Sequence, residues 1–221
     1  MEGFFANIDW GEIGAASIDT LLMLGGSLLF SVILGLPLGV LLFLTGRGQL
    51  LEQRGVNLAL SFLVNVLRSL PFIILLIVMI PLTLFLVGTS LGVAGAIPPL
   101  VAGAAPFFAR LVETALRGVD RGVIEASEAM GATTRQIVLG VLLPEARGAI
   151  LAGITVTAVA LVGYTAMAGV VGAGGLGDLA MRFGYQRFQT DVMIVTVVLL
   201  LVLVQVLQSF GDWLVARAGR R

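Results

Sequence analysis

Few residues in this chain could do chemistry. The 221-residue sequence contains no cysteine and no histidine, which excludes thiol chemistry, disulfides and most transition-metal sites. Its 13 acidic and 13 basic residues, the latter all arginine, give a formal charge of zero, and this balance argues against nucleic acid as a partner. We therefore expect no catalytic residue, no metal and no other cofactor in the chain.

One glycine-rich stretch has the spacing of a nucleotide-binding motif. GAGGLG at 172–177 matches G-x-G-x-x-G, but that motif binds dinucleotides only between a strand and a helix of a soluble βαβ unit. The sequence around it offers no such strand, so we interpret the glycines as a tight turn at the end of a membrane span. No P-loop sequence occurs in the chain, so ATP binding by that motif is not expected.

A polar segment, EASEAMGATTRQIVLGVLLPEA at 125–146, interrupts the apolar sequence. Gly131 is suited to end a first short helix, which Asp120 could cap. Thr133 with Gln136 fits a capping box that opens a second helix, and we expect Pro144 to end that helix. Its apolar residues share one face: Ile137, Val138, Val141 and Leu142. Amphipathicity alone favours a helix resting on lipid headgroups, and a docking site for a cytoplasmic partner is the alternative.

The elements that position these residues follow from the composition. With 58% hydrophobic and 12% charged residues, the chain needs lipid as its solvent, which predicts an all-α integral membrane protein. Five transmembrane helices are expected, at 21–44, 57–83, 92–116, 148–171 and 191–214. They leave room for a single transmembrane domain over 1–221, with a loop at about 118–147.

Arginine placement predicts the orientation. If the N-terminus lies outside, only Arg182 and Arg187 fall on the outer side. The inner loops and span ends then hold Arg47, Arg54, Arg110, Arg117, Arg121, Arg135, Arg147, Arg217, Arg220 and Arg221. This positive-inside bias places the polar loop and the C-terminus in the cytoplasm. The first 20 residues are acidic and lack arginine, so we expect them to be retained rather than cleaved as a signal peptide.

The 125–144 segment resembles the EAA loop of ABC-transporter permeases, with Ser127 in place of the second alanine. In that family the loop contains the coupling helix that fits a groove of the ATP-hydrolysing subunit. The residues that the resemblance assigns to coupling are Glu125, Ala126, Ser127, Gly131, Ala132, Val141, Leu143 and Pro144.

Further stretches resemble the small five-span permease of bacterial methionine importers: NVLRSLPFIILLIVMIPLT, GAAPFFARLVETAL, GVVGAGGLG and FGY. The resemblance implies a type I ABC importer permease in the bacterial inner membrane, surrounded by lipid. It also implies a homodimer, two ATP-binding subunits, an external methionine-binding protein and methionine as the substrate.

Other functions remain to be weighed against this one. A permease for another small amino acid or solute would fit the same pattern. A self-sufficient secondary carrier would need a carboxylate at membrane depth, and the expected spans have none near their centres. A membrane enzyme would need an activated nucleophile or a metal, and a scaffold would leave the coupling-type loop without a role.

Two residues of the fourth span could line the substrate path. The span starts inside near Arg147, so Tyr164 lies roughly 25 Å along the helix axis, and Met167, three positions on, shares its face. Gly163 allows close approach by another helix. Spacing alone favours ordinary packing, but a tyrosine hydroxyl at that depth needs a partner and methionine suits a moving surface. We expect the pair to form an outer gate in the dimer.

Three charged residues have structural and functional interpretations. Arg68 lies within the second span, where it could extend to the inner interface or line the pathway, and the first interpretation is slightly favoured. Glu113 and Arg117 are expected to form an i,i+4 pair on a helix surface rather than a functional site.

The orientation can be tested with reporter fusions. A reporter fused after Glu12 should be exposed outside the cell, and one fused after Arg221 should be in the cytoplasm, because the arginine bias places the polar loop inside. Activity of compartment-specific reporters measures this. A cytoplasmic signal at Glu12 in functional protein would contradict the cytoplasmic position of the 118–147 loop.

Overall fold

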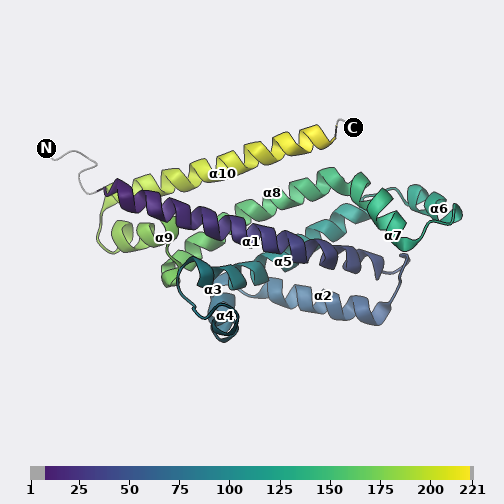
Figure 1. Ribbon diagram of the computed structural model, residues 1–221, viewed down its shortest axis with the longest axis horizontal. Coiled ribbons are helices and arrows are strands. Elements are labelled where there is room, and N and C mark those ends of the chain that lie inside the picture. Colours follow the sequence, from purple (N-terminus) through teal and green to yellow (C-terminus); the bar gives the residue numbers. More distant parts are fainter. Residues whose placement is uncertain (1–7, 220–221) are drawn as a thin grey trace.

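The computed structural model describes residues 8–219, and its elements in that part of the chain are all helices (Figure 1). Four long helices run along the molecule: α1 (Trp10–Leu44), α5 (Gly92–Arg117), α8 (Leu143–Ala168) and α10 (Thr190–Ala218). Each belongs to a segment long and apolar enough to cross a membrane, with α5 the most buried and α10 the least. The predicted all-α membrane fold is confirmed. Arg220 and Arg221, two of the arginines counted inside, lie outside the described residues.

The second expected span is broken and is not one continuous helix. α2 (Arg54–Ser69) and α3 (Phe72–Val78) meet at a bend of 106°, and α4 (Ile80–Val87) follows. Pro71 has no amide hydrogen and disfavours a helical residue before it, and Leu70 accordingly has an extended conformation with ψ of 130°. With the bent pair counted as one span, residues 8–219 contain five candidate spans by length and composition, the number expected.

The first and fourth spans begin earlier than expected. α1 begins at Trp10 because the carboxylate of Asp9 accepts hydrogen bonds from the amides of Gly11 and Glu12, at 2.8 and 3.2 Å. The expectation that Pro144 ends the second loop helix is wrong. α7 (Thr134–Ile137), a π-helical turn (Val138–Leu142) and α8 follow one another directly, because Pro144 lies in the first turn of α8, where a missing amide hydrogen is tolerated.

The centre of the bundle is the contact between α1 and α5. A Cβ atom at Gly39 would lie 2.5 Å from the carbonyl oxygen of Ala109, so only glycine allows the two helices to approach this closely. Phe43, Phe108 and Val112 pack beside this contact in a buried apolar cluster. The cluster continues into the polar loop, where Ile124 and Ile137 belong to it, and so packs the loop against the bundle.

The glycine-rich stretch forms the predicted tight turn. Gly172, Gly174 and Gly175 have φ values of 97°, 80° and 81°, which side chains with a Cβ rarely adopt. The turn leads into α9 (Gly175–Leu179), and the amide of Leu176 there donates to Thr20 Oγ1 at 2.9 Å. This bond ties the turn to α1.

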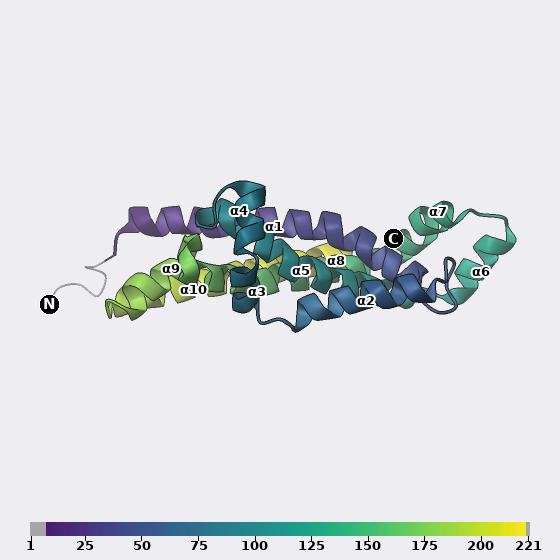
Figure 2. The ribbon, with the colours of Figure 1, turned by 90° about the horizontal axis from the view of Figure 1, so that it is seen from below.

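Arg182 joins two segments at the same end of the molecule. Its Nη2 lies 3.0 Å from both Glu12 Oε1 and Asp178 Oδ2. In both ribbon views this end lies opposite the loop that contains α6 and α7 (Figures 1 and 2). The start of α1 and the two arginines counted outside therefore share one end, as the predicted orientation requires.

A buried ion-pair cluster ties α2 to α5. Glu113 is only 4% exposed, and its carboxylate accepts from Arg110 Nη1 at 2.6 Å and from Arg117 Nη2 at 2.8 Å. Arg110 also donates to Asn65 Oδ1 of α2 at 3.1 Å. The expected Glu113–Arg117 pair is present, but the expectation that Glu113 lies on the helix surface is wrong, because its side chain is buried and also pairs with Arg110.

Replacing Glu113 by glutamine should destabilise the protein by about 3 kcal/mol, because Arg110 would keep a partly buried charge without its carboxylate. Thermal unfolding of the purified protein should show a clearly lowered midpoint. The matched control is Glu12→Gln, which removes an exposed pair with Arg182 and should change stability by less than about 1 kcal/mol. Equal effects of the two variants would show that burial of Glu113 does not matter.

Candidate functional site

The coupling-type loop projects from one end of the helix bundle. α6 (Arg121–Ala129) and α7 extend beyond the ends of the long helices in both views (Figures 1 and 2). Asp120 Oδ1 accepts from the amide of Gly122 at 2.6 Å and starts α6. Thr133 and Gln136 form the predicted capping box at the start of α7. The two predicted short helices are therefore present, although the second continues into α8.

Gly131 makes the bend between these helices. Its φ of 79° is left-handed, and a Cβ placed there would meet no atom within 4 Å. Its amide donates to the Glu128 carbonyl at 2.9 Å, and that of Ala132 donates to the Ser127 carbonyl at 3.1 Å. The site therefore needs glycine for its backbone conformation and not for lack of space.

One side of the loop is attached to the bundle. Ile137 and Leu142 are fully or almost fully buried in the cluster around Phe108, and Val141 and Leu143 pack against it. Ser127 is also buried, and its hydroxyl donates to the Val123 carbonyl at 2.8 Å. The predicted apolar face is thus confirmed as a contact with the protein's own core.

The other side of the loop is exposed. Glu125 pairs with Arg121 at 3.0 Å on the surface, and Ala126 beside it is open to solvent. Met130 and Leu139 are 81% and 56% exposed, and Pro144 is exposed near the start of α8. A polar loop that presents a large methionine and a leucine offers an apolar contact surface to another molecule.

The structure places Tyr164 and Met167 in separate hollows. Met167 and Gly163 line a hollow of about 450 Å³ at the end of α8 away from the loop, together with Met181, Tyr185 and Met193. This lining consists mainly of flexible apolar side chains, which can repack when helices move. Although the two residues are predicted to share one face, they do not line the same hollow. Tyr164 faces α3 and α5, away from the hollow that Met167 lines.

Tyr164 lines a smaller hollow of about 260 Å³ beside the bend of the broken span. Its ring stacks on Phe72, with centroids 4.7 Å apart and planes inclined by 9°. Arg68 and Phe107 also line this hollow, and the Arg68 guanidinium lies 5.8 Å from the centre of the Phe107 ring. Arg68 therefore faces the same space as Tyr164, which sequence patterns did not indicate because the bend at Pro71 creates it.

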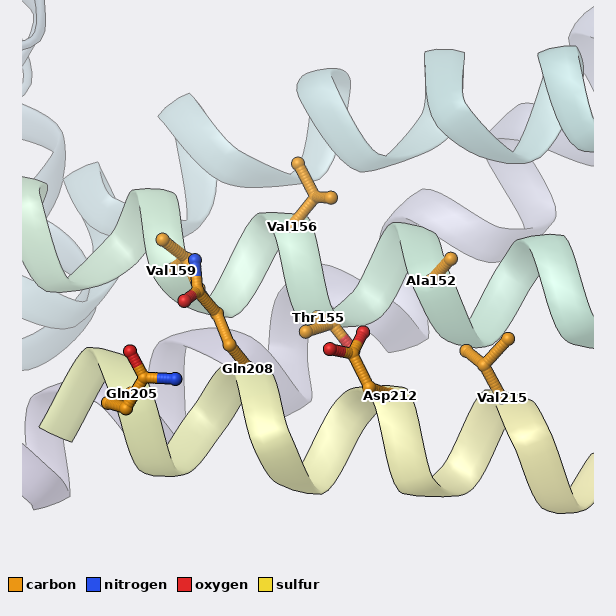
Figure 3. A pocket seen from close by; sticks show the side chains of 8 residues that line it. All are labelled: Ala152, Thr155, Val156, Val159, Gln205, Gln208, Asp212 and Val215. Atoms are coloured by element: carbon orange, nitrogen blue, oxygen red, sulfur yellow. The ribbon is translucent and has the colours of Figure 1, made fainter.

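A third hollow, of about 450 Å³, lies between α8 and α10 (Figure 3). Thr155 projects from α8, and Gln205, Gln208 and Asp212 project from α10 on the opposite side. The neighbouring Trp213 lies under Arg217, and such aromatic and arginine residues mark the membrane interface. This polar lining therefore approaches the expected headgroup level at the C-terminal end of α10.

Comparison with known proteins decides the family. The model of the family described as binding-protein-dependent transport system inner membrane component matches residues 35–220. The chain belongs to this family. The permease is therefore an inner-membrane transport subunit, and the match includes the loop and all three hollows.

Named relatives are similar to the permease over most of their length. The probable D-methionine transport system permease protein MetI of Vibrio cholerae serotype O1 is 53% identical over 85% of this chain and 84% of its own. The methionine import system permease protein MetP of Bacillus subtilis strain 168 is 51% identical over 96% and 95%.

Solved structures agree with the fold. A structure of the MetNI methionine ABC transporter in inward-facing conformations is 46% identical, covers 96% of this chain and 99% of its own, and has a TM-score of 0.92. An amino acid ABC transporter crystallised with histidines has a TM-score of 0.76 at 18% identity over 94% of each chain, which supports the fold alone.

Proposed function

We propose that this chain is the permease subunit of an ATP-driven importer of methionine. The observation that supports it most is similarity over nearly the full chain to the MetNI methionine ABC transporter and to the two named methionine permeases. The assembly is a homodimer with two ATP-binding subunits and an external methionine-binding protein. The N-terminus faces outward and the C-terminus faces the cytoplasm.

The exposed side of the loop is the surface that the ATPase binds. Glu125, Ala126 and Gly131 lie on this side, with Met130 as the most exposed large apolar residue. The residues on the other side, Ser127, Ala132, Val141 and Leu143, hold the loop against the bundle, and Pro144 starts the helix that continues from it. Force on the loop therefore acts directly on α8.

Transport follows from the alternation of two states. ATP binding closes the ATPase subunits and draws the two loops of the dimer together, which turns the spans outward to receive methionine from the binding protein. Hydrolysis resets them. Each ligand shifts this equilibrium only by its different affinities for the two states, so ATP and the loaded binding protein must both favour the outward-facing one.

Uptake into liposomes tests this function. Liposomes that contain the complete complex, with binding protein outside and ATP inside, should accumulate labelled methionine, whereas the permease alone should not.

The variant Gly131→Leu should insert into the membrane normally but lose co-purification with the ATPase and lose methionine uptake. The reason is that a left-handed backbone conformation costs a leucine about 1–2 kcal/mol.

The matched control is Gly131→Asn, since asparagine tolerates the left-handed conformation and should retain both the ATPase and transport. Full co-purification and full uptake of Gly131→Leu would mean that the loop rests on lipid and does not couple ATP hydrolysis to transport.

The outer gate is the second part of the proposal. Met167, with Gly163, lies in the methionine-rich hollow near the outer end, and Tyr164 supports Phe72 at the bend. Met167→Ala should alter methionine uptake, or the ATP hydrolysed per methionine, while the assembly stays intact. Tyr164→Ala should do the same by releasing the stacked Phe72. Both rates are measured in the reconstituted complex, and unchanged rates in both variants would assign the two residues to packing alone.

A further inference from the structure

Arg68 lies deep in the membrane-spanning region. It occupies the last turn of α2, about 20 Å along the helix from Arg54 at its inner end. It also lines one hollow with Tyr164, which lies at a similar depth on α8, about 25 Å from Arg147. Measured along two helices that start on the inner side, Arg68 and Tyr164 therefore lie at similar depths. This depth is too great for Arg68 to lie at the inner interface.

The charge of Arg68 is not neutralised within the described chain. Among residues 8–219, the ion pairs join Glu113, Glu125, Glu12 and Asp178 to other arginines. Arg68 instead lies over the Phe107 ring. A guanidinium at membrane depth is costly against hydrocarbon, so this face must meet water, a second chain or an anion.

The hollow beside Arg68 has the size and lining of a site for a small molecule. Its volume of about 260 Å³ falls below the range of ~300–1,000 Å³ typical of drug-sized ligands. The stacked rings of Phe72 and Tyr164 form one wall, and Phe107 lies under the guanidinium. One cation and three aromatic rings therefore surround the same small space.

We propose that this hollow binds the transported amino acid, with its α-carboxylate on the guanidinium of Arg68. This inference rests on the proposed function and deepens it by assigning the recognising group. Arginine binds carboxylates through two parallel hydrogen bonds. The thioether of methionine then lies among the rings of Phe72, Phe107 and Tyr164, since sulfur makes favourable contacts with aromatic edges.

The other two hollows fit an amino-acid carboxylate less well. The hollow between α8 and α10 contains Asp212 (Figure 3), which repels an anion. The methionine-rich hollow has no charged residue in its lining. A lipid phosphate shares the chemistry that Arg68 recognises, but headgroups lie at the membrane surface and not at the depth of Tyr164.

The test is equilibrium binding of labelled methionine to the permease–ATPase complex without the external binding protein. The complex is held in nanodiscs of phosphatidylcholine and phosphatidylglycerol. Wild type should bind methionine roughly tenfold or more tightly than methionine amide, which lacks the carboxylate charge. Arg68→Gln should lose this discrimination and bind methionine roughly tenfold more weakly, whereas Arg68→Lys should keep part of it.

The matched control is Arg187→Gln, which also removes an exposed arginine that lies over an aromatic ring, that of Phe183 at 4.5 Å. It should retain full discrimination. Because only the difference between acid and amide is compared across variants, a methionine site on the ATPase subunits would not mimic the effect.

Discrimination that persists in Arg68→Gln would overturn the inference, and a concurrent loss of co-purified phosphatidylglycerol would assign Arg68 to lipid. Uptake by the wild-type complex separates the two proposals. If that complex takes up no methionine, the proposed function fails. If it does, and the variant still discriminates, only the role of Arg68 fails.

Discussion

The backbone of a membrane-spanning chain must satisfy its hydrogen bonds without water, and the rest of this structure depends on that constraint. Uninterrupted helices meet it at every residue, which is why α1, α5, α8 and α10 are long. Each departure from a regular helix leaves amides or carbonyls that need another partner. The break at Pro71, the π-helical turn at 138–142 and the glycine turn at 169–175 are such departures. A protein can keep them only where neighbouring helices or water supply the missing contacts.

These departures coincide with the functional surfaces. The break at Pro71 opens the hollow of Arg68 and Tyr164. The turn at 138–142 joins the exposed loop of α6 and α7 to α8, and the turn at 169–175 borders the hollow of Met167. π-helical turns occur often at functional sites, since irregular backbone has fewer competing hydrogen bonds to lose when it moves. The candidate sites thus lie beside places where regular helical geometry is interrupted.

The sequence was sufficient for the features that depend on local chemistry. Hydrophobic lengths gave the spans, and Asp120, Gly131 and the Thr133–Gln136 box gave the loop, because caps and turns act over three or four residues. It was insufficient where distant residues meet. The bond from Arg110, the partner of Glu113, to Asn65 joins α5 to α2, and the hollow at Arg68 depends on a bend that brings Phe72 against Tyr164. No periodicity within one helix contains that information. Pro144 was misjudged for a local reason, since a proline that ends one helix and one that starts another have the same sequence signature.

The continuity of α7, the π-helical turn and α8 has a mechanical consequence. Residues from Thr134 to Ala168 form a single connected rod, with the loop at one end and Tyr164 and Met167 toward the other. The rod is held between α1, α5 and α10, and close-packed contacts of this kind shift between discrete arrangements and do not deform gradually. A displacement of the loop must therefore tilt or rotate the whole rod, which changes both hollows at once. Because Tyr164 stacks on Phe72, such a movement would also act on the bend at Pro71, and one helix and one aromatic contact would then couple the loop to the hollow at Arg68.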